Sequence, residues 1–192
     1  MPKSKILAFS GSTRRESFNR RLLAITVTAA REAGADVTHI DLDDFPLPIY
    51  DQDLEQESGP PENALKLKEL FLTHQGLLLA CPEYNSSVTP LWKNTIDWVS
   101  RPDSTRSALA AYNDKTAVIM SASPGALGGL RGLVHVRSIL ANIGVLVLPE
   151  QLAIGSASGA FDDAGNLIDP KQHDKARDLG KLLASVLDRL HA

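Results

Sequence analysis

Short apolar runs alternate with helix-spaced apolar residues along most of this 192-residue chain. Five runs are short enough for strands buried in a parallel sheet, at residues 6–9, 37–40, 76–81, 116–120 and 145–148. Between and after them, apolar residues recur three or four positions apart, which predicts helices across residues 22–30, 65–72, 91–99, 130–140 and 179–190. Such alternation is typical of an α/β domain with a parallel sheet. Residues 41–61 hold four prolines and several acids, and we expect a long ordered loop there rather than an element.

Composition limits the domain count and the classes of partner. With 43% hydrophobic residues, we expect residues 1–192 to form one domain with a single core. The chain has 20 basic and 23 acidic residues, so its composition gives no support for a nucleic-acid partner. No stretch approaches the roughly 20 apolar residues of a membrane-spanning helix, and the start of the chain does not resemble a signal peptide. The single cysteine, Cys81, excludes an internal disulfide and is compatible with a reducing cytoplasm, where we expect the protein to work.

The segment of residues 10–19, which we call the phosphate loop, lies between the first predicted strand and the first predicted helix. Helix N-termini carry unpaired N–H groups and partial positive charge, which favour a bound anion. Ser12, Thr13 and Ser17 add hydroxyl donors, and Arg14 adds a guanidinium group. The loop has neither G-x-x-x-x-G-K-[ST] nor G-x-G-x-x-G, so a terminal monophosphate suits it better than a triphosphate or a dinucleotide. The alternative is that Ser17 only caps the helix and the arginines are solvated.

Two further loops follow strands. Pro82-Glu83-Tyr84-Asn85 comes after the third strand, and residues 121–129, rich in serine and glycine, come after the fourth. In open parallel sheets, ligands bind outside the carboxyl ends of the strands. If the first and third strands are neighbours, the second loop could lie along a flat ring beside the phosphate. The alternatives are an ordinary turn with a packing tyrosine and a flexible strand-to-helix connection.

Together these segments resemble the NAD(P)H-dependent FMN reductase family. The resemblance rests on G-S-T-R-x-x-S-F-N, on P-E-Y-N with K-N-x-I-D-W, and on S-x-S-P-G-x-x-G-G, in that order across about residues 5–150. It implies a flavodoxin-like three-layer sandwich, with a five-stranded parallel sheet of order 2-1-3-4-5 and helices on both faces. It also implies bound FMN, which passes hydride from NADPH or NADH to a quinone, azo compound, metal oxyanion or free flavin.

The resemblance assigns a cofactor-binding role to residues of all three loops. It implies that the FMN phosphate binds to Ser12, Arg14, Ser17, Phe18 and Asn19. It implies that the isoalloxazine ring lies along Pro82, Glu83, Tyr84 and Asn85, with Ser121, Ser123 and Gly125 at its edge. In such a site the cofactor carries the chemistry, so we expect no catalytic side chain. The five histidines lack metal-ligand spacing, and we expect no metal.

Three other function classes remain open at this point. A flavodoxin-type electron carrier would hold FMN without nicotinamide activity, but such carriers usually have a stronger acidic excess than the net charge of −3 found here. A serine hydrolase is disfavoured by the absence of G-x-S-x-G. A non-enzymatic sensor of a phosphate ligand is the third.

We also expect a homodimer or homotetramer whose interface borders the flavin. The helices at residues 91–99 and 130–140 carry apolar residues on more than one face, so part of that surface needs a cover. The resemblance implies dimers and tetramers as well. The alternative is a monomer in which residues 41–61 fold over these helices.

Overall fold

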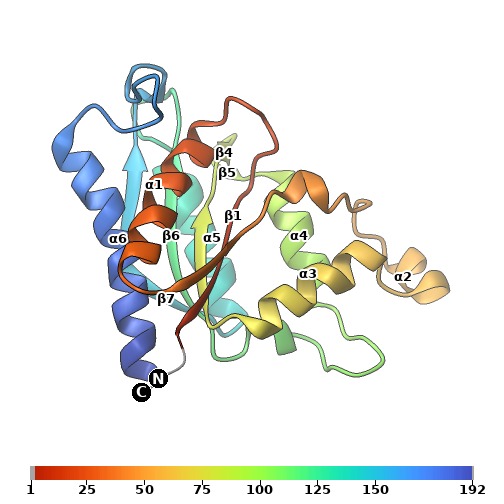
Figure 1. Ribbon diagram of the computed structural model, residues 1–192. Coiled ribbons are helices and arrows are strands. Elements are labelled where there is room, and N and C mark those ends of the chain that lie inside the picture. The colour runs from red at the N-terminus through yellow and green to blue at the C-terminus, as the bar shows by residue number, and fades with distance from the viewer. Residues whose placement is uncertain (1–2, 192) are drawn as a thin grey trace.

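The computed structural model describes residues 3–191 and contains a five-stranded parallel sheet (Figure 1). Its strands are β1 (Lys5–Ser10), β2 (Asp36–His39), β3 (Gly76–Ala80), β6 (Thr116–Ala122) and β7 (Leu146–Ile154). They lie in the order β2-β1-β3-β6-β7, which is 2-1-3-4-5 among these five strands. β1 pairs on both sides, with Ile6 opposite Val37 of β2 and Gly76 of β3. The predicted class, strand number and strand order are therefore confirmed.

Helices cover both faces of the sheet, as predicted (Figure 1). One face packs against α1 (Phe18–Glu32) and α6 (Pro170–Leu190), and the other packs against α3 (Glu62–Thr73), α4 (Pro90–Ser100) and α5 (Leu130–Asn142). β1 shows how one strand supplies two cores, because Ile6 and Ala8 face α1 while Leu7 and Phe9 face the α3 side. In the described part of the chain, no helix is both long and apolar enough to span a membrane.

The prediction of a loop without elements at residues 41–61 is wrong. The segment contains a 3-10 turn, η1 (Leu42–Asp44), and a helix, α2 (Gln52–Ser58). Aspartates cap both: the Asp41 carboxylate accepts from the Asp43 N–H, and the Asp51 carboxylate accepts from the N–H groups of Asp53 and Leu54. α2 buries no residue, so it lacks the apolar periodicity by which a helix is recognised. Its N-cap residue, Asp51, is the sequence feature that could have predicted the start of this helix.

The loop after β3 holds a small hairpin that the sequence analysis did not predict. Its strands are β4 (Glu83–Tyr84) and β5 (Ser87–Val88), which pair antiparallel. The turn residues Asn85 and Ser86 have φ values of 51° and 64°. Two positive φ values in a two-residue connection are typical of a type I′ turn, which matches the twist of the flanking strands.

β7 extends well beyond the predicted residues 145–148. Its pairing with β6 shifts register between Ala117 and Ile119 of β6, where β7 bulges. The Arg137 guanidinium of α5 donates to the carbonyls of Val147 and Leu148, at 3.1 and 2.8 Å, and to that of Pro149. These bonds satisfy carbonyl groups that a bulged ladder leaves free.

Two 3-10 turns, η2 (Ala110–Tyr112) and η3 (Ala157–Gly159), lie in connecting segments.

Residues 45–58, which we call the strap, meet α4 at Pro48 and Tyr50, and then continue into α2, which lies further to the right in Figure 1. The Asn94 amide donates to the Pro48 carbonyl and accepts from the Tyr50 N–H, both at 2.8 Å. The Trp98 indole also donates to the Pro48 carbonyl, at 2.8 Å. Trp92, Ile96, Trp98 and Val99 are each at most 2% exposed. The described chain itself therefore covers these four residues of α4, whereas Leu91 of the same helix is half-buried.

Candidate functional site

The loops after β1, β3 and β6 lie at one end of the sheet, the upper end in Figure 1. The first two loops touch. The Gly11 N–H donates to the Ala80 carbonyl at 2.9 Å, and the Thr89 hydroxyl donates to the Gly11 carbonyl at 2.9 Å. A Cβ on Gly11 would meet the Trp92 Cβ at 3.0 Å. The predicted convergence of these loops is thus confirmed, and Gly11 permits the close approach.

The phosphate loop presents unpaired donors at the start of α1. Ser17 is the N-cap residue and is 2% exposed, yet its hydroxyl makes no capping bond to the helix. The Arg14 side chain is exposed and forms no ion pair among residues 3–191; its guanidinium lies over the Phe18 ring, 5.3 Å from the centroid. Phe18 in turn stacks on Phe161. Free backbone N–H groups, a hydroxyl and a guanidinium at a helix N-terminus are a donor set that fits the phosphate of FMN.

Asn19 is held by the protein itself. Its side-chain amide donates to the Ala122 carbonyl at 2.8 Å and accepts from the Ala122 N–H at 3.0 Å. Asn19 is 4% exposed, and these two bonds join the first turn of α1 to the end of β6. The geometry therefore gives this predicted phosphate ligand a positioning task, which is to fix the helix N-terminus relative to the sheet.

The β4–β5 hairpin is hydrogen-bonded to the start of α5. The Glu83 carboxylate accepts from the Gly132 N–H at 2.7 Å, and the Arg131 guanidinium donates to the Ser86 hydroxyl at 3.0 Å. A negative charge is favourable at a helix N-terminus. Tyr84 is 58% exposed, which confirms that it lies outside the core. Pro82 is buried and Asn85 is exposed. The hairpin therefore presents an aromatic face to solvent from a braced position.

The third loop is braced by the end of β7. Ser121 is fully buried, and a Cβ on Gly129 would lie 2.0 Å from its hydroxyl, so that hydroxyl faces the loop backbone. The Ser123 hydroxyl accepts from the Gly125 N–H at 3.3 Å, and the Gly125 carbonyl accepts from the Ser156 N–H at 3.2 Å. Gly125 is exposed and Ser123 is half-buried, so these two predicted residues are open to a ligand while Ser121 is not.

Two contributors to the site were missed by the sequence analysis. Thr89 caps α4 and joins it to the phosphate loop; a threonine followed by proline is a helix-start signal that could have identified the cap. The second is Gly132, where a larger residue would crowd the hairpin, because a Cβ at this position would lie 3.2 Å from the Glu83 Cβ. No local pattern indicates that contact.

The cysteine near the site is not activated as a nucleophile. Cys81 is buried at the end of β3, and burial raises the pKa of its thiol far above its ordinary value. The thiol is therefore protonated at neutral pH and inert. Within residues 3–191, no three His, Cys, Asp or Glu side chains are grouped so that they could hold a metal ion.

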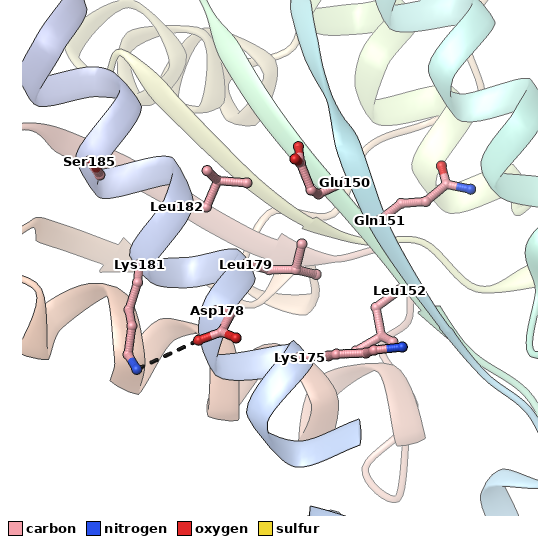
Figure 2. A pocket seen from close by; sticks show the side chains of 9 residues that line it. All are labelled: Glu150, Gln151, Leu152, Lys175, Asp178, Leu179, Lys181, Leu182 and Ser185. Atoms are coloured by element: carbon pink, nitrogen blue, oxygen red, sulfur yellow. Dashed lines mark ion pairs between the residues drawn. The ribbon is translucent and has the colours of Figure 1, made fainter. Parts of the chain in front are cut away.

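A separate cavity of about 650 Å³ lies between β7 and α6 (Figure 2). Leu152, Leu179 and Leu182 line it, and Lys181 and Asp178 face each other at 3.7 Å at its rim. It lies beside the middle of an edge strand and not at the carboxyl ends of strands, where ligands of this architecture bind. We therefore place the candidate site at the three loops.

Comparisons with known proteins identify the family. The family model described as NADPH-dependent FMN reductase matches residues 4–159. An NAD(P)H-dependent FMN reductase of Pseudomonas aeruginosa is 35% identical over 176 residues, covering 91% of this chain and 88% of that protein. A quinone reductase of Escherichia coli is 34% identical over 177 residues, covering 86% and 88%.

A solved structure shows the same fold. It is a flavoenzyme NAD(P)H:(acceptor) oxidoreductase from Paracoccus denitrificans, with a TM-score of 0.78 and 23% identity, covering 97% of this chain and 98% of that one. The phosphate loop, the β4–β5 hairpin and the loop after β6 all fall inside the matched residues 4–159. The protein therefore belongs to the NADPH-dependent FMN reductase family, as its three motifs predicted.

Proposed function

We propose that this protein is an FMN-dependent oxidoreductase that takes hydride from NADPH or NADH and passes it to a small quinone-type acceptor. Family membership carries the class of activity and the cofactor. The quinone acceptor is supported by relatives named quinone reductase and by the NADPH:quinone oxidoreductase of Arabidopsis thaliana, 34% identical over 173 residues. The single structural observation that supports it best is the exposed, braced Tyr84 beside a phosphate-type loop.

The residues of this chain bind and orient, and FMN supplies the hydride chemistry when bound. Arg14, Ser17 and the first N–H groups of α1 hold the phosphate in this proposal. Tyr84 offers one face for the flat ring, while Glu83 and Asn19 keep the hairpin and α1 in place. Gly125 and Ser123 leave their backbone open at the edge of the ring. In this proposal the coenzyme and the acceptor occupy the same space one after the other, which implies ping-pong kinetics.

The visible spectrum of the purified protein tests this proposal. A flavin band that bleaches on anaerobic addition of NADPH or NADH, and returns when a benzoquinone is added, is the expected result. A flavin band that neither coenzyme bleaches would instead identify an FMN electron carrier. A colourless protein that takes up no FMN would remove the flavoenzyme class altogether.

We also propose a homo-oligomer with its interface next to the flavin, working in the cytoplasm. Leu127, in the loop after β6, and Leu130 and Val134, in the first turns of α5, are 48%, 42% and 59% exposed. A cavity of about 400 Å³ lies between α4 and the C-terminal half of α5. Exposed apolar side chains grouped in this way are typical of a protein interface. The single buried cysteine supports a reducing compartment.

A further inference from the structure

A cavity of about 340 Å³ lies on the β2 side of the phosphate loop. It is formed by the ends of β1 and β2, the first turn of α1 and the turn η1. Its lining residues are polar with one exception, and they are Ser10, Ser12, Arg20, His39, Ile40, Asp41 and Asp44. Ser12 is a predicted FMN ligand and Ser10 begins the phosphate loop, whereas the other lining residues lie outside that loop, so the cavity adjoins the flavin site on its β2 side.

Two groups in this cavity lack partners. Ser10 is 5% exposed, and its buried hydroxyl forms no hydrogen bond within residues 3–191. Buried hydroxyl groups are normally paired, so an unpaired one that lines a cavity indicates a ligand that supplies the partner. The Asp44 carboxylate is exposed and forms neither a hydrogen bond nor an ion pair in the described part of the chain. Asp41, in contrast, pairs with Arg20 at 2.5 Å.

The charges of the cavity select the kind of ligand. It contains two carboxylates and one guanidinium, and that guanidinium is already paired. Loss of hydration, together with the nearby Arg31 and Arg20, lowers the pKa of His39, so its imidazole is neutral at pH 7. A phosphate would meet net negative charge here, whereas uncharged hydroxyl groups could donate to the carboxylates and accept from Ser10. The residues of this cavity do not form a metal site, because no three His, Cys, Asp or Glu side chains within residues 3–191 are close enough together to hold a metal ion.

The position of the cavity identifies the source of those hydroxyl groups. In dinucleotide-binding Rossmann domains, an acidic residue near the end of the second strand binds a ribose. This chain lacks the G-x-G-x-x-G of those domains, and the N-terminus of α1 is assigned to the FMN phosphate, so only the acidic ribose contact is carried over from that geometry. Neighbouring strands are about 4.8 Å apart, so the end of β2 is roughly 10 Å from the end of β3 and roughly 14 Å from the end of β6. We propose that this cavity binds the adenosine ribose of the nicotinamide coenzyme and selects NADH over NADPH. The inference rests on the proposed function and adds the coenzyme preference to it.

Binding of coenzyme fragments to the FMN-loaded protein is the direct test. In titration calorimetry, 5′-AMP should bind more tightly than 2′,5′-ADP, whose extra phosphate would face Asp44. Removing the charge with Asp44→Asn should weaken 5′-AMP binding about tenfold, as for a lost hydrogen bond to a charged group, and reduce the preference for NADH in kcat/KM. Asp43→Asn is the matched control, because Asp43 is an exposed neighbour outside the cavity. Equal effects of the two variants, or tighter binding of 2′,5′-ADP, would overturn the proposal.

Ser10→Ala gives a second, independent measurement. Because the hydroxyl has no partner in the described chain, its removal should leave the thermal stability of the ligand-free protein unchanged or higher. The same variant should weaken 5′-AMP binding several-fold. Unchanged 5′-AMP binding in a folded Ser10→Ala protein would contradict the assignment.

The proposed function and this inference fail in different ways. If the yellow wild-type protein oxidises neither NADH nor NADPH, the proposed function is wrong. If it oxidises them with a ratio of kcat/KM that Asp44→Asn and Asp43→Asn leave equal, the function stands and the ribose site is wrong.

Discussion

The Arg14 side chain makes no ion pair among residues 3–191 and lies over the Phe18 ring. It is exposed, and its only described side-chain neighbour is the Phe18 ring. Replacing it with alanine should weaken FMN binding by about 1–3 kcal/mol, the range for a charge-assisted hydrogen bond, with little effect on folding. Fluorescence titration of the apoprotein with FMN measures this. Arg15→Ala is the control, and an equal loss in both variants would mean that net charge alone attracts the phosphate.

Substitution of Tyr84 tests flavin binding with little effect on folding, because its side chain is more than half exposed. Tyr84→Ala should change the free energy of unfolding by less than about 0.5 kcal/mol. It should lower flavin affinity by about 1 kcal/mol and reduce turnover, because an aromatic face is lost from the ring site. Tyr84→Phe keeps the face and should behave as wild type. Wild-type affinity and turnover in a folded Tyr84→Ala protein would remove Tyr84 from the site.

Gly129 and Gly144 form a matched pair for backbone strain. Their φ values are 88° and 90°, where a side chain costs about 1–2 kcal/mol at either position. A Cβ on Gly144 would meet nothing within 4 Å, whereas one on Gly129 would lie 2.0 Å from the Ser121 hydroxyl. Gly129→Ala should therefore destabilise the protein more than Gly144→Ala in urea unfolding. Equal losses would show that the loop after β6 can move away from Ser121.

At the scale of elements, the strap is joined to the end of α4 by an ion pair. The Arg101 guanidinium donates to the Glu55 carboxylate at 2.8 Å, and the Tyr50 hydroxyl donates to the same carboxylate at 2.9 Å. The bond from Arg101 lowers the pKa of Glu55 below its ordinary value of 4.5. A lowered pKa in the folded state contributes stability that is present above pH 4.5 and is lost as the pH falls below it.

Glu55→Gln should therefore destabilise the protein by about 1 kcal/mol at neutral pH, a modest value because the pair is only partly shielded from water. The difference from wild type should shrink as the pH falls below 4.5. Thermal unfolding at several pH values measures both. Glu57→Gln, an exposed change on the same helix, is the control. A difference that does not depend on pH would assign the loss to packing and not to charge.

At the scale of the molecule, the open question is what covers the start of α5. Light scattering should give at least twice the chain mass of 20.7 kDa at micromolar concentration. Val134→Glu should shift the protein towards one chain and weaken flavin binding, because the proposed interface borders the flavin. Ile168→Glu, at a similarly exposed isoleucine outside α5, should do neither. A wild-type mass of one chain with full NADPH oxidation would contradict an obligatory dimer.

Local pattern predicted the sheet, the helices on its two faces and the three loops, because burial imposes a period on apolar residues and strands of one parallel sheet end at one edge. It did not predict α2, which buries no residue, and it gave the cover of α4 by residues 41–61 only as the alternative to a partner chain.

Pairings between distant residues were decided only by the tertiary structure. The Asn19 amide meets Ala122 across 103 positions of sequence, and Glu83 meets Gly132 across 49. The sequence alone thus determined which loops could hold FMN. Only the folded chain decided which of their polar side chains are already bound to the protein and which, such as Arg14 and Ser10, form no hydrogen bond or ion pair within the described residues. The reason is that a hydrogen bond depends on distance in space, and residue type at one position does not specify its partner.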